Sequence, residues 1–161
     1  MKEDLQQLWE NFLDTSSLEE QELFVQFMEG LKRKKKGIND SFISSFLQIE
    51  QKLGDHELEI TFPISPFTLN ALGIVHGGIT ATALDTVMGT YAFHLIPEDK
   101  AAVTSEMHVH FLAMGVGETI TVKATCLHKG NTRLVMEGKA YRDDGTLMGH
   151  ATATFHIIPR P

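Results

Sequence analysis

The turn before the most apolar predicted helix carries residue types suited to acyl transfer. His76, Gly77 and Gly78 follow the segment Asn70-Ala71-Leu72-Gly73-Ile74-Val75 and lead into a helical run with one acidic residue, Asp85. A helix start exposes unpaired backbone N–H groups and the positive end of the helix dipole, and paired glycines let a ligand approach that backbone closely. The turn therefore offers donors to a carbonyl oxygen or an anion, and Asp85 offers a base or a nucleophile.

Length, charge and cysteine content narrow the class of protein. The chain has 161 residues, is 42% apolar and carries a net charge of −7, which predicts one domain with a core and argues against nucleic acid or an anionic membrane as a partner. Cys126 is the only cysteine, so an internal disulfide and a cysteine-based zinc site are excluded. No window is apolar over the ~18 residues that a membrane span needs, and the N-terminus does not resemble a signal peptide. A cytoplasmic protein is therefore expected.

Residues 1–38 are expected to form an N-terminal helical extension, followed by the main domain at residues 39–161. The first predicted helix carries apolar residues on one face: Leu5, Leu8, Trp9, Phe12 and Leu13. A capping box at Ser16 or Ser17 predicts the start of a second helix, which ends with the run Lys32–Lys36 before Gly37. Cations suit a solvated helix C-terminus, because the dipole is negative there. A basic patch for ligand phosphates or for an acidic partner is the alternative.

The rest of the chain predicts strands on either side of one long helix. Apolar alternation favours strands over about residues 42–53 and 56–63, joined by a hairpin turn at Gly54-Asp55. The helix is predicted from Gly77 to about Leu95, before Pro97. Four more strands are predicted over about residues 102–112, 118–128, 132–142 and 146–158, with hairpin-type turns between them. A twisted antiparallel sheet that curls around the single helix is the packing that this order favours.

These residues together resemble the hotdog-fold acyl-CoA thioesterases, and in particular the phenylacetate-pathway type. The resemblance covers about residues 40–158 and rests on Asn70, His76-Gly77-Gly78 and Asp85 at the family's spacing, on residues 103–112 and on the turn at residues 128–132. It implies an α+β hotdog fold with an antiparallel sheet wrapped around one long central helix. It also implies hydrolysis of acyl-CoA thioesters to free acid and CoA, without a metal or another cofactor.

The resemblance implies a role for each residue of the motif. The Gly77 N–H polarises the thioester carbonyl, and Asp85 acts as a general base on water or as a nucleophile. Asn70 orients the water or the thioester group, and His76 positions the turn and can contact the thioester. Thr104 stands where the family has a Ser or Thr beside the catalytic carboxylate.

The phosphates of CoA need a local cationic rim on a protein of net charge −7. Lys129 and Arg133 flank a turn that matches the family's, and Gly130 within it allows close approach of the backbone. We expect these three residues, with Gly78, to bind substrate, although solvated turn residues are an equal alternative for the two cations. The run Lys32–Lys36 is the second candidate for the phosphates.

The spacing of Gly77 and Asp85 has a consequence for assembly. The two residues stand eight positions apart, which is ~12 Å along a helix axis. One carbonyl carbon needs both groups within roughly 3–4 Å, so two subunits must supply them. If the catalytic interpretation holds, the protein is a homodimer or a dimer of dimers (a homotetramer), with acyl-CoA as its small-molecule partner.

Other functions stay open at this level. A non-catalytic acyl-CoA-binding hotdog module is the main alternative, although binding alone does not need a carboxylate near an anionic ligand. A hotdog hydratase or dehydratase needs a different constellation of a histidine and an acid, which is not found. Glu106, His108 and His110 share one strand face and are possible metal ligands, but they spread over ~13 Å, so no metal is expected. The acyl group is not indicated.

Overall fold

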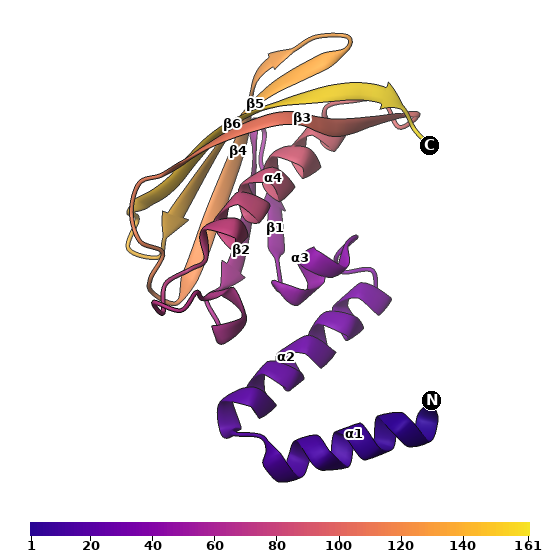
Figure 1. Cartoon of the computed structure of the whole chain (residues 1–161). Helices are drawn as coiled ribbons and strands as arrows, with labels where there is room; N and C mark the ends of the chain where they lie inside the picture. Colours follow the sequence, from indigo (N-terminus) through magenta and orange to yellow (C-terminus); the bar gives the residue numbers. More distant parts are fainter. The chain divides into compact units, whose positions relative to one another are not determined.

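The computed structural model describes all residues, Met1–Pro161, and divides the chain into two compact units, Met1–Gln48 and Ile49–Pro161 (Figure 1). The domain boundary expected after residue 38 lies earlier than this division and stays a prediction. No helix of the protein combines the length and the apolar character needed to cross a membrane.

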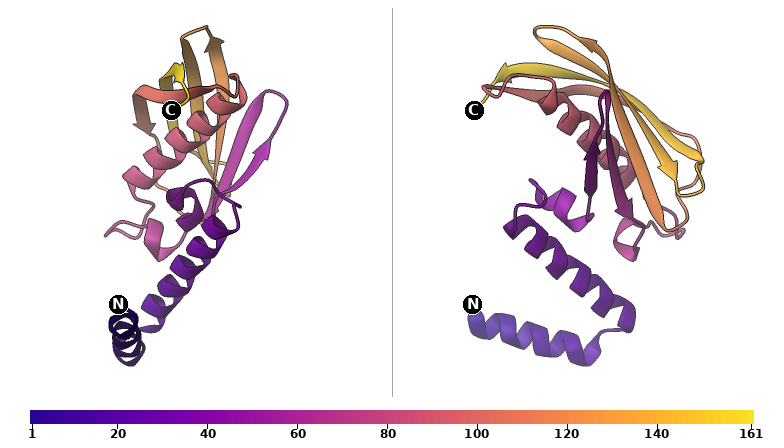
Figure 2. Two further views of the ribbon diagram at one scale, coloured as in Figure 1. Left: turned by 90° about the vertical axis from the view of Figure 1, so that its right-hand side faces the viewer. Right: turned by 180° about the vertical axis from the view of Figure 1, so that it is seen from behind.

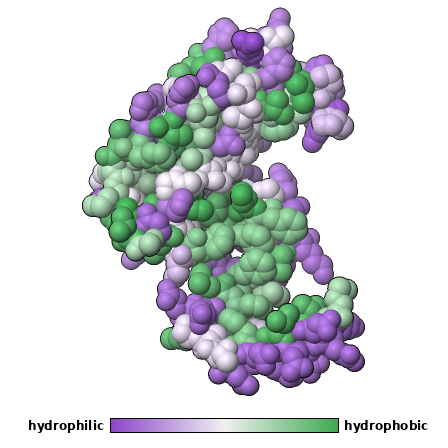
Figure 3. Space-filling view, viewed as in Figure 1, coloured by the Kyte–Doolittle hydropathy of each residue, from purple (hydrophilic) through white to green (hydrophobic).

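The N-terminal unit consists of the helices α1 (Lys2–Thr15), α2 (Leu18–Lys35) and α3 (Phe42–Phe46). The predicted capping box starts α2: Ser17 Oγ accepts a hydrogen bond from Glu20 N–H, and the Glu20 carboxylate accepts one from Ser17 N–H at 2.7 Å. The Trp9 ring of α1 packs on Phe24 of α2, with the ring centroids 4.6 Å apart. No residue of α1 is buried, and Figure 3 shows hydrophilic side chains along this helix with apolar surface above them.

The strand predicted over residues 42–53 is wrong in its first half, because α3 takes its place. Ser41 Oγ accepts a hydrogen bond from Ser44 N–H, and Ser45 Oγ donates to Ser41 O at 2.9 Å. Such local bonds from serine to the backbone favour a capped helical turn, which apolar alternation does not reveal. The strand β1 begins only at Glu50 and ends at Leu53.

The second unit contains a six-stranded antiparallel sheet (Figure 2). A short 3-10 helix, Pro66–Thr68, follows the second strand. The strands after β1 lie close to the predicted ranges: β2 (Glu57–Pro63), β3 (Lys100–Phe111), β4 (Thr119–Lys129), β5 (Arg133–Arg142) and β6 (Leu147–Pro159). Their order in the sheet is β1-β2-β4-β5-β6-β3.

The hairpin predicted between β3 and β4 is wrong. β3 pairs with β6 at the edge of the sheet, and the connection crosses the end of the sheet instead of turning back. Tertiary contacts hold this connection: Gly115 O accepts a hydrogen bond from Val75 N–H at 2.9 Å, and the Asp143 carboxylate accepts one from Glu118 N–H at 2.7 Å. Glycine-containing segments occur both in hairpin turns and in connections that cross the end of a sheet. The composition of this segment therefore did not distinguish the two.

The helix α4 (Gly77–His94) packs on one face of this sheet, as predicted. Five of its apolar side chains are fully buried: Ala83, Leu84, Val87, Met88 and Ala92. Gly138 in β5 allows the close approach, because a Cβ there would lie 3.0 Å from Leu84 Cδ2. The sheet thus fixes the position of α4 and of the residues at its start.

Candidate active site

The loop before α4 is a closed turn built around Asn70. Leu69 and Val75 pair as an antiparallel bridge, and Gly73 N–H donates to Asn70 O at 2.9 Å with Gly73 at a φ of 71°. The side-chain oxygen of Asn70 accepts a hydrogen bond from Leu72 N–H at 2.8 Å. This bond orients the side chain of Asn70 and leaves its NH2 group without a partner in the chain.

His76 caps the start of α4 and accounts for most of the backbone donors there. Its Nδ1 accepts a hydrogen bond from Gly78 N–H at 2.8 Å, so the neutral ring carries its proton on Nε2. Its carbonyl oxygen accepts from Ile79 N–H and Thr80 N–H at 2.9 and 3.1 Å. The Gly77 N–H has no acceptor in the chain. One donor therefore stays available at the positive end of the helix dipole.

An aromatic ring lies next to this donor. A Cβ at Gly77 would lie 3.4 Å from Cε1 of Phe111, the last residue of β3, whose side chain is exposed. Phe111 is not among the site residues predicted from the sequence. No local pattern indicates this contact, because it arises where β3 returns to the start of α4.

Asp85 lies two turns along α4 and is hydrogen-bonded to the edge strand. Thr104 Oγ1 in β3 donates to Asp85 Oδ1 at 2.8 Å. The register of β3 against β6 shifts between Thr104 and Glu106, which marks a bulge. Without that bulge Thr104 would share a face with Glu106, because side chains alternate along a strand. The bulge instead turns Thr104 towards α4 and Glu106 towards the opposite face.

One chain does not bring all the predicted site residues together. Gly77 and Asp85 are ~12 Å apart along the axis of α4. Lys129, Gly130 and Arg133 lie at the turn between β4 and β5, at the end of the sheet opposite the start of α4 (Figure 1). Gly130 N–H donates to Arg133 O at 2.9 Å in this turn. The predicted residues thus form three separate groups within one subunit.

The alternating acid and histidines of β3 lie on the face of the sheet away from α4. Glu106 accepts a hydrogen bond from Thr154 Oγ1 at 2.8 Å and lies 3.1 Å from His108 Nε2, and these hydrogen bonds lower the pKa of Glu106. The ring of His110 stacks near His150, with the centroids 6.2 Å apart. No three His, Cys, Asp or Glu side chains of the protein lie close enough to share a metal ion. These residues pair with their neighbours instead.

Comparison with known proteins identifies the family. The sequence profile of the thioesterase superfamily matches residues 72–148, which include Gly77, Asp85 and Thr104. The crystal structure of the Bacillus halodurans protein BH2602 with CoA superposes with a TM-score of 0.87 and 35% identity, over 93% of this chain and 100% of that one. This chain belongs to the thioesterase superfamily. Its expected hotdog fold is thereby confirmed, and its family supports hydrolysis of thioesters.

Two further relatives support this family assignment. A hypothetical thioesterase protein from Streptococcus pneumoniae, solved with coenzyme A, matches with a TM-score of 0.64 and 26% identity, over 70% of this chain and 87% of that one. A Saccharolobus solfataricus protein named as an esterase is 28% identical over 116 residues, which is 71% of this chain and 77% of that protein. The match to the Bacillus protein covers a larger share of this chain than Ile49–Pro161 makes up, so it extends into the N-terminal unit.

Proposed function

We propose that this thioesterase hydrolyses acyl-CoA to a free acid and CoA, at a site shared by the two subunits of a homodimer. The observation that carries the proposal is the distribution of groups along α4. A free N–H donor at Gly77 and a carboxylate at Asp85 lie on one helix, ~12 Å apart, so they cannot act on the same carbonyl within one subunit.

The start of α4 supplies the electrophilic half of the proposed site. The thioester carbonyl oxygen accepts a hydrogen bond from Gly77 N–H, and the helix dipole stabilises the negative charge that develops on this oxygen. His76 keeps its Nε2–H on the exposed side of the turn, since its Nδ1 is occupied by Gly78. The ring of Phe111 offers apolar surface beside the donor.

Asp85 of the other subunit supplies the nucleophilic half. Its carboxylate removes a proton from a water that attacks the carbonyl carbon, or it attacks that carbon itself and forms a mixed anhydride, which water then hydrolyses to the free acid. The C–S bond then breaks and the thiolate of CoA leaves and takes up a proton. Thr104 holds Asp85 Oδ1, which leaves Oδ2 for the water, and the free NH2 group of Asn70 is available to orient the water or the thioester.

The edge strand β3 is the proposed dimer contact. It pairs with β6 on one side only, and it leaves Val103 and Phe111 exposed by 43% and 59%. An edge strand presents unpaired backbone groups that a second copy can pair with. Two-fold pairing of β3 with its copy joins two sheets and sets the two α4 helices antiparallel, so that Gly77 of one subunit approaches Asp85 of the other.

The relatives support CoA as the carrier of the acyl group. The Bacillus and Streptococcus proteins were both solved with CoA, and the motif resembles the phenylacetate-pathway type. Lys129, Gly130 and Arg133 are the proposed contacts to the CoA phosphates. We propose a cytoplasmic enzyme that acts on an aryl or a short to medium aliphatic acyl group. Rates on a panel of acyl-CoAs, compared as kcat/KM, identify the group.

Hybrid dimers test the shared site. Asp85→Asn and Gly77→Pro homodimers are expected to be inactive, whereas a mixture after subunit exchange contains hybrids with one intact site. Random exchange makes half of the dimers hybrid, so activity is expected to return to about a quarter of the wild-type value. Activity that stays at background, once exchange is verified, contradicts the shared site. A wild-type protein that binds acyl-CoA without hydrolysing any member of the panel is the binding module instead.

A further inference from the structure

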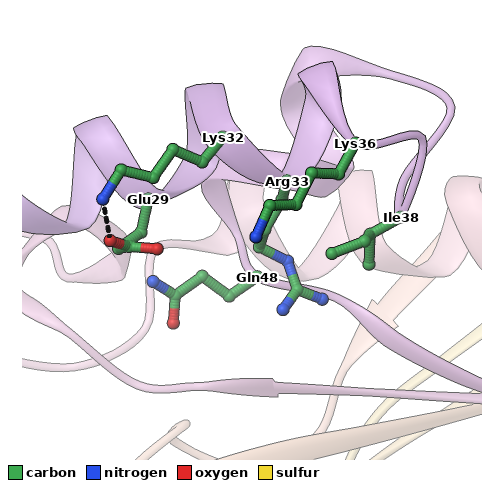
Figure 4. A pocket seen from close by; sticks show the side chains of 6 residues that line it. All are labelled: Glu29, Lys32, Arg33, Lys36, Ile38 and Gln48. Atoms are coloured by element: carbon green, nitrogen blue, oxygen red, sulfur yellow. Dashed lines mark hydrogen bonds and ion pairs between the residues drawn. The ribbon is translucent and has the colours of Figure 1, made fainter.

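The N-terminal unit contains a pocket at the C-terminal end of α2, which we call the α2 pocket. Its volume is about 300 Å³, at the lower end of the range of small-molecule sites. Six residues line it: Glu29, Lys32, Arg33, Lys36, Ile38 and Gln48 (Figure 4). Three cations and one carboxylate give the lining a positive charge. None of the residues proposed for catalysis belongs to it.

The cations reach one side of the helix through their spacing. The C-cap residue Lys36 stands three positions after Arg33 and four after Lys32, and both spacings make side chains neighbours on a helix surface. Figure 4 shows Arg33 and Lys36 extending to the same side of the helix, where Gln48 also lies. Like charges at these spacings repel one another, and an anion bound between them would relieve this repulsion.

Capping of α2 does not require these side chains. Gly37, at a φ of 69°, donates its N–H to Lys34 O at 3.1 Å, and Ile38 N–H donates to Arg33 O at 3.1 Å. This pair of bonds is a Schellman motif, which satisfies carbonyls at the end of the helix. The lysine and arginine side chains are therefore not needed as partners for those carbonyls.

The lining is partly organised in advance. Asn39 Oδ1 accepts a hydrogen bond from Arg33 Nε at 3.0 Å, which fixes the plane of the guanidinium group, and Glu29 holds Lys32 in an ion pair at 2.6 Å. Lys36 forms no ion pair. Gln48 is the only residue other than glycine with a positive φ, at 53°, a strained conformation of the kind found at ligand sites.

We propose that the α2 pocket binds the phosphate groups of a small ligand that carries a diphosphate, with Arg33 and Lys36 as the main contacts and the amide of Gln48 as a further donor. A guanidinium group of fixed orientation forms paired hydrogen bonds to two phosphate oxygens, and Lys36 adds a mobile point charge. The diphosphate belongs either to the CoA part of the substrate, in which case this pocket takes the place of Lys129 and Arg133 as the contact to the diphosphate, or to a separate nucleotide. The first source rests on the proposed function, whereas the second does not.

Calorimetric titration of the full-length protein with inorganic pyrophosphate tests the pocket. Lys36→Gln is expected to raise the Kd about tenfold, because it removes a hydrogen bond between charged groups. Lys35→Gln is the matched control, since it removes the same charge from the same helical turn outside the pocket, and it should change the Kd less than about twofold. Neither change touches a buried group, so both proteins should unfold at the wild-type temperature. Equal weakening by both substitutions, or no binding of pyrophosphate by the wild type, overturns the proposal.

Two substrates then distinguish the sources of the phosphate. If the diphosphate is that of CoA, Lys36→Gln raises KM for acyl-CoA and leaves KM for an acyl-N-acetylcysteamine thioester unchanged. If it belongs to a separate nucleotide, both KM values stay at the wild-type level while pyrophosphate binding is lost. The titration needs no turnover. If the protein does not hydrolyse thioesters, the proposed function is refuted and the proposal for the α2 pocket is unaffected.

Discussion

The Thr104 hydroxyl donates a hydrogen bond to Asp85 Oδ1 at 2.8 Å, and it joins the edge strand β3 to the helix α4. The bulge between Thr104 and Glu106 makes this bond possible, because it turns Thr104 to the helix side of the sheet. A carboxylate held by one oxygen has a fixed orientation, so the other oxygen points in a defined direction. The bond thus supports a positioning role for Thr104 and a chemical role for Asp85, and the two roles predict different kinetics.

Asp85→Asn is expected to lower kcat by about 10²–10⁴-fold, the contribution of a general base. The amide has the shape of the carboxylate and keeps an oxygen to accept from Thr104, so the thermal unfolding temperature should not fall. Steady-state hydrolysis of acyl-CoA and a thermal melt of the same preparation measure both effects. Turnover near the wild-type level is incompatible with a catalytic Asp85.

Thr104→Val is expected to lower kcat about tenfold and to leave KM nearly unchanged, because it removes one hydrogen bond without changing the size of the side chain. Thr104→Ser is the control, since it keeps the hydroxyl and should retain most of the activity. The same assay compares the two variants. If both variants lose the same activity, the methyl group of Thr104 matters and the bond to Asp85 does not.

Gly77→Pro removes the proposed donor with little change to the helix. Proline is favoured at the first helical position, and His76 has an extended backbone with a ψ of 133°, which suits a residue before proline. The loss of an oxyanion donor is expected to lower kcat by about 10²–10³-fold. Gly77→Ala keeps the N–H and adds a methyl group near Phe111, so it should retain far more activity. Equal activity in the two variants means that this N–H does not act on the substrate.

Local patterns predicted most elements of the fold. The start of α4 at Gly77 follows from the glycine pair, and the burial of alternate residues in β2 follows from the alternation that predicted this strand. The pairing of β3 with β6 and the helix α3 did not follow, because a long-range pairing decides the first and serine-to-backbone bonds decide the second.

The features of the candidate site also divide into those that the sequence predicted and those that it did not. The spacing of Gly77 and Asp85 along one helix predicted that the two residues cannot act on the same carbonyl within one subunit. The family resemblance alone implied that Thr104 stands beside Asp85. The hydrogen bond between them depends on a bulge that no sequence pattern marks. The ring of Phe111 beside Gly77 depends on where β3 ends in space. Contacts within one element could therefore be predicted, whereas contacts between elements could not.

Gly138→Ala is expected to destabilise the fold by about 1–3 kcal/mol, the cost of overpacking a core. The added Cβ would lie 3.0 Å from Leu84 Cδ2 and 3.2 Å from Met88 Sδ, so α4 or its side chains must shift. Gly54→Ala in the turn between β1 and β2 is the control, because the nearest atom there lies 3.4 Å away. Urea unfolding measures both changes. A Gly138→Ala protein as stable as the control shows that α4 does not pack this closely.

Glu137→Gln is expected to lower the free energy of unfolding by up to about 1 kcal/mol at neutral pH and by much less in acid. Lys139 Nζ donates to Glu137 Oε2 at 2.8 Å and His150 Nε2 lies 3.0 Å from Oε1, and these bonds hold the pKa of Glu137 below its ordinary value of 4.5. A carboxyl whose pKa is lower in the folded state stabilises the protein above the unfolded pKa. This contribution is lost as the pH falls through the folded pKa.

The two proteins are therefore expected to differ in urea unfolding at about pH 7 and to differ less at about pH 3, because protonation of the carboxyl removes its contribution. Glu50→Gln is the control, because Glu50 is an exposed residue of β1 with no ion pair, and it should leave stability unchanged at both values. A difference for Glu137→Gln that persists in acid would mean that the shape of the side chain, and not its charge, stabilises the outer face of the sheet.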